Sequence, residues 1–410
     1  MAKGASKLPA DLVLAGGGVK GIGHVGAITV LEERGYEFQR VAGTSAGAIV
    51  GALVASGLTS TELREVMMSL DFRSFQDKGP LTRLPLIGPG LSVLFENGIF
   101  EGDAVHEWLE GELAKKGIRT FEDLKIRDPK SSLAPNESYR LVVMATDVTR
   151  GELIRLPWDY PRYGLDPDKQ LVADAVRASM SIPFFFRPVT IHYKGRPSTV
   201  VDGGVLSNFP IDAFDRADTA PPRWPTFGVT LVPKLPAGNA DLLPLLGIVK
   251  HGPVGLLESL VTTMLVGHDQ SQLAKPWIAA RSIEVDTKKA GIVDFGIKPA
   301  AEQQLYESGR SAAEAFLKTW SWDRYRKRFG LPTTSAPVAA RTTSRGRPWP
   351  QLALSARESD RVPGEAPRAR PQAPSAATPR PSRPTPAAGT RSARPAHAAH
   401  GRRRFSDPHS

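Results

Sequence analysis

The chain has 410 residues, of which 41% are hydrophobic, so it carries enough apolar side chains for a large globular core. It contains no cysteine, which excludes disulfides and thiolate metal sites. Its net charge of +11 comes almost wholly from residues 331–410, where 14 arginines stand against four acidic residues, so the basicity is not that of a folded nucleic-acid-binding surface.

The first part of the chain alternates short apolar segments with helical patterns. Strands are expected over Asp11–Ala15, Phe38–Ala42, Tyr139–Thr146 and Phe227–Val232, and helices over Gly23–Arg34 and from the turn at Gly43–Gly47 to about Ser56. Buried apolar strands that alternate with helices are typical of a mainly parallel sheet covered on both faces. We therefore expect an α/β fold, in three layers α/β/α with a mainly parallel central sheet.

Two apolar stretches, Ser74–Asn97 and Asp241–Gly267, are broken by Pro and Gly. Ordinary packing helices and loops would have this composition, and so would a lid or lipid-contacting segments. The sequence leaves both interpretations open.

A glycine-rich loop, Gly16–Gly21 (GGGVKG), follows the first predicted strand and opens the first helix. Glycines let the backbone turn sharply, and the unpaired N–H groups at a helix N-terminus then converge on one point. Such a loop suits an anion, either a phosphate or a transient oxyanion.

The segment Gly43–Gly47 (GTSAG) also joins a predicted strand to a predicted helix. Glycines on both sides of Ser45 permit a strained turn that lifts the hydroxyl clear of the backbone, as in a nucleophile elbow. The five-residue pattern is weak alone, and its position between a strand and a helix is what favours a nucleophilic serine.

A third motif, Asp202-Gly203-Gly204, follows the apolar pair Val200-Val201. An aspartate at a strand end, beside open glycine backbone, is well placed to act on a neighbouring element. The same three residues are also good turn formers, and a simple turn is the better interpretation of this motif in isolation.

The three motifs together are far more specific than any one of them. The set resembles the patatin-like phospholipases, a family of lipid acyl hydrolases that use a Ser–Asp dyad. Four further stretches are similar to the same family: Gly98–Asp103 (GIFEGD), Ala145–Asp147 (ATD), Arg177–Phe185 (RASMSIPFF) and Asp202–Pro210 (DGGVLSNFP). The resemblance extends from about Leu12 to Phe295 and does not include the tail.

The resemblance implies that Ser45 attacks the ester carbonyl and that Asp202 takes its proton, then activates water for deacylation. It places the oxyanion hole at Gly16, Gly17, Gly18 and Val19, with Lys20 keeping the loop positive. The supporting positions of the motifs are Gly21, Gly43, Gly47, Gly203 and Gly204. An aspartate of ordinary pKa is a weak base for an alcohol, so the oxyanion hole must carry much of the catalysis.

The implied reaction is hydrolysis of carboxylic ester bonds in lipids through an acyl-serine, of phospholipase A or lysophospholipase type. It requires no metal and no cofactor. The expected partner is a phospholipid or another lipid ester, with peripheral membrane contact and no specific nucleic acid. The sequence does not settle the head group, the ester position, the chain length or the oligomeric state.

Two alternatives concern the same loop and serine. Gly16–Gly21 also fits the phosphate-binding fingerprint of dinucleotide-binding domains, with Glu37 near the expected distance, but Glu37 begins the second predicted strand instead of ending it. A thioester acyltransferase or thioesterase on the same fold would pair serine with histidine, and the Asp-Gly-Gly motif speaks against it.

A Ser–His–Asp triad is a further alternative. The globular part holds five histidines: His24, His106, His192, His251 and His268. His24 lies nearest the glycine loop but is expected to pack on the following helix. None of the five stands in a histidine-loop context after an acid, as the α/β-hydrolase order Ser…Asp…His requires.

The tail, 331–410, is rich in Pro, Ala and Arg and too poor in large apolar residues to offset the entropy of ordering. We expect a catalytic domain over residues 8–330 and a disordered tail over 331–410. A lipid-binding protein that uses this basic tail is the non-enzymatic alternative. The sequence shows no signal peptide and no membrane span, so it predicts a cytoplasmic protein, with a peripheral location at membranes as an option. It does not exclude a secreted effector.

Overall fold

The computed structural model describes residues 7–75, 100–128, 133–134, 137–216, 222–231, 272–287 and 296–329. Its strands are β1 (Leu8–Leu14), β2 (Tyr36–Thr44), β3 (Leu141–Asp147), β4 (Glu152–Leu156), β5 (Val189–Tyr193), β6 (Arg196–Asp202), β7 (Thr226–Thr230) and β8 (Ser282–Glu284). Its helices are α1 (Ile22–Glu33), α2 (Ala46–Ala55), α3 (Ser60–Met68), α5 (Asp103–Ala114), α6 (Val172–Ser179), α8 (Pro276–Ala279), α9 (Pro299–Thr319) and α10 (Trp322–Arg328).

The strands form one sheet in the order β5-β6-β3-β2-β1-β7-β8, with β4 also paired to β3. Pairing is parallel from β3 through β2, β1 and β7 to β8, and antiparallel where β4, β6 and β5 join. The expected mainly parallel sheet with flanking helices is confirmed. β1 lies between two parallel neighbours, β2 on one side and β7 on the other, so the strand order reverses at β1. In α/β proteins, ligands commonly bind at the carboxyl end of the strands at such a point.

Alternate residues of the central strands enter two apolar layers. Leu12 and Leu14 of β1 pack in the larger cluster with α1, α2 and α9, and Val13 packs in a smaller cluster on the other face. The smaller cluster includes Phe209 from the segment after β6 and Ile278 of α8. Every residue of β3 and β7 is buried, as expected for central strands whose two faces are both covered.

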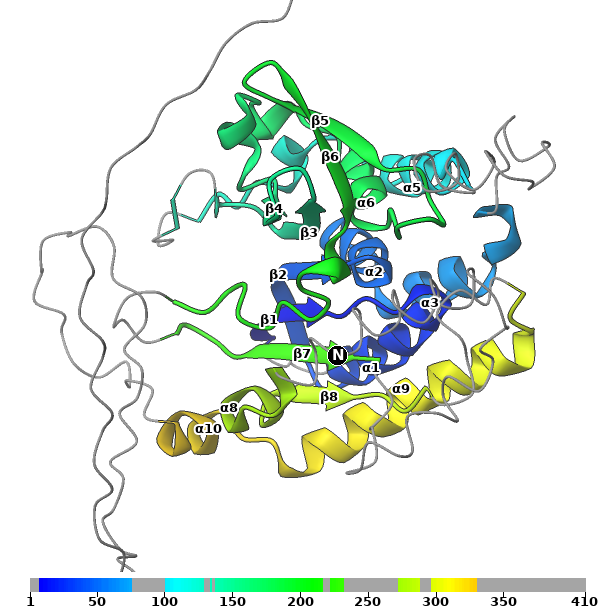
Figure 1. Ribbon diagram of the computed structural model, residues 1–410. Coiled ribbons are helices and arrows are strands. Elements are labelled where there is room, and N and C mark those ends of the chain that lie inside the picture. Colours follow the sequence, from blue (N-terminus) through cyan, green and yellow to red (C-terminus); the bar gives the residue numbers. More distant parts are fainter. Residues whose placement is uncertain are drawn as a thin grey trace, which may run out of the picture. The chain divides into compact units, whose positions relative to one another are not determined.

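Helices α1 and α9 lie side by side along one face of the sheet (Figure 1). Glycines permit this close crossing: a Cβ on Gly26 would collide with the carbonyl of Tyr306, and one on Gly309 with the carbonyl of Gly23. Helix α9 therefore supports the helix that follows the glycine loop.

The four predicted strands correspond to β1, β2, β3 and β7, and the two predicted helices to α1 and α2, with ends within a few residues. The stretch 76–97 of the first apolar segment, the whole of Asp241–Gly267 and the tail 331–410 lie outside the described residues. The boundary expected at residue 330 therefore stays a prediction.

Candidate active site

Ser45 occupies the single position between the end of β2 and the start of α2. Its backbone has φ 52° and ψ −120°, a conformation that non-glycine residues rarely adopt. The flanking glycines are required because backbones meet there: a Cβ on Gly43 would collide with the Gly47 carbonyl, and one on Gly47 with the Leu14 carbonyl. The segment is a strained strand-to-helix turn, as the sequence predicted.

Asp202 ends β6 and is completely buried. Its Oδ1 accepts a 2.7 Å hydrogen bond from the Gly204 amide, and its Oδ2 has no partner at hydrogen-bonding geometry. Burial raises the pKa of Asp202 to about 7, against the lowering effects of the Gly204 amide and the Ser45 hydroxyl. This carboxyl group is therefore a far better proton acceptor than an exposed aspartate.

The sheet register explains how residues 157 positions apart come together. Thr44, directly before the nucleophile position, pairs with Met144 of β3, and the next β3 residue, Ala145, pairs with Asp202. Gly203 then packs so closely over Met144 that a Cβ would collide with its carbonyl. Strand β3 thus separates and aligns the serine and the aspartate.

The glycine loop passes into a 3-10 helix over Gly18–Gly21 and then into α1. The Gly16 amide donates a 3.0 Å hydrogen bond to the Asn208 carbonyl, so it is already engaged. Within the described part of the chain, no backbone carbonyl accepts from the amides of Gly17, Gly18 or Val19. Those three amides are therefore available to bind an anion. The Gly16 amide is already bonded to Asn208, which does not favour Gly16 as part of the predicted oxyanion hole.

Comparison with known proteins agrees with this arrangement. The sequence profile described as patatin-like phospholipase matches residues 12–215, which span the glycine loop, the serine turn and the Asp-Gly-Gly motif. The uncharacterized protein YqhO of Bacillus subtilis is 39% identical over 319 residues, covering 76% of this chain and 99% of that protein. The chain belongs to the patatin-like phospholipase family. It is thus a member of a lipid hydrolase family.

Two more distant similarities extend the comparison. The probable lipid hydrolase 463L of Invertebrate iridescent virus 6 is 26% identical over 207 residues, which cover 49% of this chain and 61% of the viral protein. The crystal structure of VipD from Legionella pneumophila aligns with a TM-score of 0.43 and 18% identity, over 77% of this chain and 67% of that one.

Lys20 lies in the patatin-like glycine loop and is mostly buried. Burial lowers its pKa to about 8, because a desolvated ammonium is less stable than a hydrated one. The side chain is therefore a cation at neutral pH and loses its charge in mildly alkaline solution.

The described histidines do not form a triad with Ser45. His24 is fully buried on α1, where its Nε2 donates to the Ala15 carbonyl at 2.8 Å, and burial lowers its pKa to about 4. His106 pairs with Asp174 at 2.7 Å, and His192 lies on an exposed position of β5. His251 and His268 lie outside the described residues.

Two side chains that sequence reasoning did not single out contact the motifs. The Ser179 hydroxyl accepts a 2.9 Å hydrogen bond from the Ser45 amide, and the Asn208 side chain donates to the Gly16 carbonyl at 3.4 Å. Both residues stand inside stretches that carry the family resemblance, so their location in those stretches was the available signal. Their individual contacts depend on tertiary structure.

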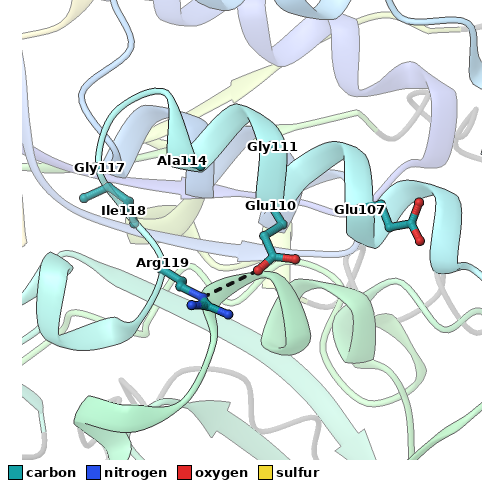
Figure 2. Close-up of a pocket in the computed structure, with 7 residues that line it drawn as sticks. All are labelled: Glu107, Glu110, Gly111, Ala114, Gly117, Ile118 and Arg119. Atoms are coloured by element: carbon teal, nitrogen blue, oxygen red, sulfur yellow. Dashed lines mark ion pairs between the residues drawn. The ribbon is translucent and has the colours of Figure 1, made fainter.

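A pocket on α5 and the turn after it does not coincide with this site (Figure 2). It is open, and Glu110 and Arg119 form a 3.6 Å ion pair beside it. None of the predicted site residues lines it. Among the described residues, no cluster of three or more His, Asp or Glu side chains could hold a metal ion, and no helix is long and apolar enough to cross a bilayer.

Proposed function

We propose that this protein hydrolyses carboxylic ester bonds in lipids through a Ser45–Asp202 dyad and an acyl-serine intermediate. The observation that carries the proposal is the pairing of a serine on a strained turn with a buried carboxyl group that has an unbonded oxygen. A serine hydroxyl is a poor nucleophile without a positioned base, and Asp202 is the titratable group whose pKa the Ser45 hydroxyl affects.

In the first half-reaction, Ser45 Oγ attacks the ester carbonyl carbon and its proton passes to Asp202. The carbonyl oxygen becomes an oxyanion, which the amides of Gly17, Gly18 and Val19 are placed to stabilise at the N-terminal end of α1. Collapse of the tetrahedral intermediate breaks the bond to the alcohol, which leaves with the proton from Asp202.

In the second half-reaction, Asp202 takes a proton from water, and the resulting hydroxide attacks the acyl-serine. Collapse of the second tetrahedral intermediate releases the fatty acid and returns the proton to Ser45. The scheme uses only groups of this chain and water. Phospholipid is the proposed substrate class, and the family and the similarity to a probable lipid hydrolase support a lipid ester.

A covalent probe tests the nucleophile directly. Purified protein is incubated with an alkyl phosphonate that mimics the tetrahedral intermediate, and the labelled peptide is found by mass spectrometry. The proposal predicts one adduct, on Ser45, and release of fatty acid from phospholipid vesicles that the probe abolishes. Labelling at another residue, with Ser45 unmodified, would refute the assignment.

A further inference from the structure

The end of helix α6 contacts both members of the proposed dyad. The Ser179 hydroxyl, fully buried, accepts a 2.9 Å hydrogen bond from the backbone amide of Ser45. Two residues later, the Ser181 carbonyl accepts a 2.9 Å hydrogen bond from the backbone amide of Asp202. We propose that Ser179 is a positioning residue, which holds the strained backbone of Ser45 so that its hydroxyl faces Asp202.

The backbone of Ser45 has an unusual conformation. A non-glycine residue at φ 52° is strained, and such a conformation persists only where the surroundings determine it. Glycines at 43 and 47 let the neighbouring backbones approach, but they do not themselves favour this conformation of the serine. The hydrogen bond to Ser179 does, because its donor is the amide of the strained residue itself.

The same hydrogen bond assigns roles to the amides of the site. Its donor, the Ser45 amide, is bonded to a side chain and is not free to stabilise an oxyanion. The amides of Gly17, Gly18 and Val19, which no backbone carbonyl of the described residues engages, remain for that role.

Buried polar contacts fix the α6 end in turn. Arg177 is buried and its Nη1 donates a 2.6 Å hydrogen bond to the Ser181 hydroxyl. Its Nη2 donates to the carbonyls of Glu101 and Arg187, the latter at 2.9 Å. Gly102 packs against this guanidinium, where a Cβ would collide with it. A guanidinium that joins three segments holds the acceptor groups of α6 in place.

The inference rests on the proposed function, since it concerns how that dyad is held. It is tested by Ser179→Ala, which removes the acceptor, and by Ser179→Thr, which keeps the hydroxyl. The matched control is Ser282→Ala on β8, which removes another buried hydroxyl, one that donates a 2.7 Å hydrogen bond to the Ile278 carbonyl of α8. Each variant is assayed for kcat, KM, rate of phosphonate labelling at Ser45 and thermal midpoint.

We expect Ser179→Ala to lower kcat and the labelling rate together, by about tenfold for one lost hydrogen bond, with KM within about twofold of wild type. Ser179→Thr, which keeps the hydroxyl, should have both rates near those of wild type. Ser282→Ala should leave both rates unchanged, even if its thermal midpoint falls as far as that of Ser179→Ala. Wild-type rates in Ser179→Ala, or equal losses in folded Ser282→Ala, would overturn the positioning role. Absence of labelling at Ser45 in the wild-type protein would instead overturn the proposed function.

Discussion

Gly16 and Asn208 are joined by two hydrogen bonds: the Gly16 amide donates to the Asn208 carbonyl at 3.0 Å, and the Asn208 side chain donates to the Gly16 carbonyl at 3.4 Å. Asn208 lies six positions after Asp202 in the chain, so this pair connects the glycine loop to the segment that carries the proposed base. A Cβ on Gly16 would collide with the Asn208 amide oxygen and come within 3.3 Å of the Ser45 Cβ.

Asn208→Ala removes the side-chain bond and leaves the backbone bond in place. We expect kcat to fall by up to about tenfold, because the glycine loop loses one of its two attachments to this segment. Steady-state kinetics on a short-chain ester measures the effect, and circular dichroism checks the fold. An unchanged kcat would show that the backbone bond alone holds the loop.

The raised pKa of Asp202 predicts the pH dependence of activity. A general base acts only when ionised, so with a pKa of about 7 the fraction of active enzyme increases as pH rises through neutrality. We expect kcat/KM to rise about tenfold per pH unit below 7 and then to level off. A profile already level between pH 5 and 7 would contradict Asp202 as the base.

Lys20 predicts a second change at higher pH. Its pKa of about 8 means that the glycine loop loses a positive charge in mildly alkaline solution, where an oxyanion would be less well stabilised. Wild-type kcat/KM should therefore decline above about pH 8. In Lys20→Arg the guanidinium stays charged, and the decline should disappear. A decline that persists unchanged in this variant would assign it to another group.

Burial of Asp202 also predicts a cost in stability. Its folded pKa lies above its unfolded value of 3.8, so the unfolded state ionises first as pH rises and stability is lost between about pH 4 and 7. Asp202→Asn avoids this loss. We expect it to be more stable than wild type at pH 9, by up to about 4 kcal/mol, and similar to wild type near pH 4. Urea unfolding at the two pH values measures both differences, and equal stability at pH 9 would contradict the raised pKa.

The sequence predicted the parts of the site that local chemistry determines. Backbone atoms crowd Gly43 and Gly47, and the side chains of Asn208 and Leu231 crowd Gly16 and Gly17, so a Cβ at any of these positions would collide. The spacing of these glycines next to apolar strands was visible in the sequence. Strands β1, β2, β3 and β7 were predictable because the buried part of each holds a short, mostly apolar run, such as Leu12–Leu14 in β1 and Leu141–Ala145 in β3.

Other features depend on contacts between distant segments. The hydrogen bond from Ser45 to Ser179 joins residues 134 positions apart, and no local pattern distinguishes that serine from Ser181. The engagement of the Gly16 amide by Asn208 likewise follows from packing across 192 positions. Strand β8 has only three residues, too few for a periodic pattern.

Ser45 and Asp202 are proposed to act as one dyad, and loss of either should abolish hydrolysis. Hydrolysis of a short-chain ester and of mixed phospholipid vesicles, without added metal, is compared for wild type, Ser45→Ala and Asp202→Asn, each checked for folding. Asp202→Asn keeps an acceptor for the Gly204 amide, so it removes the base with little change in shape. We expect wild type to be active and both variants to be folded with activity at background. Folded Asp202→Asn with wild-type activity would contradict it.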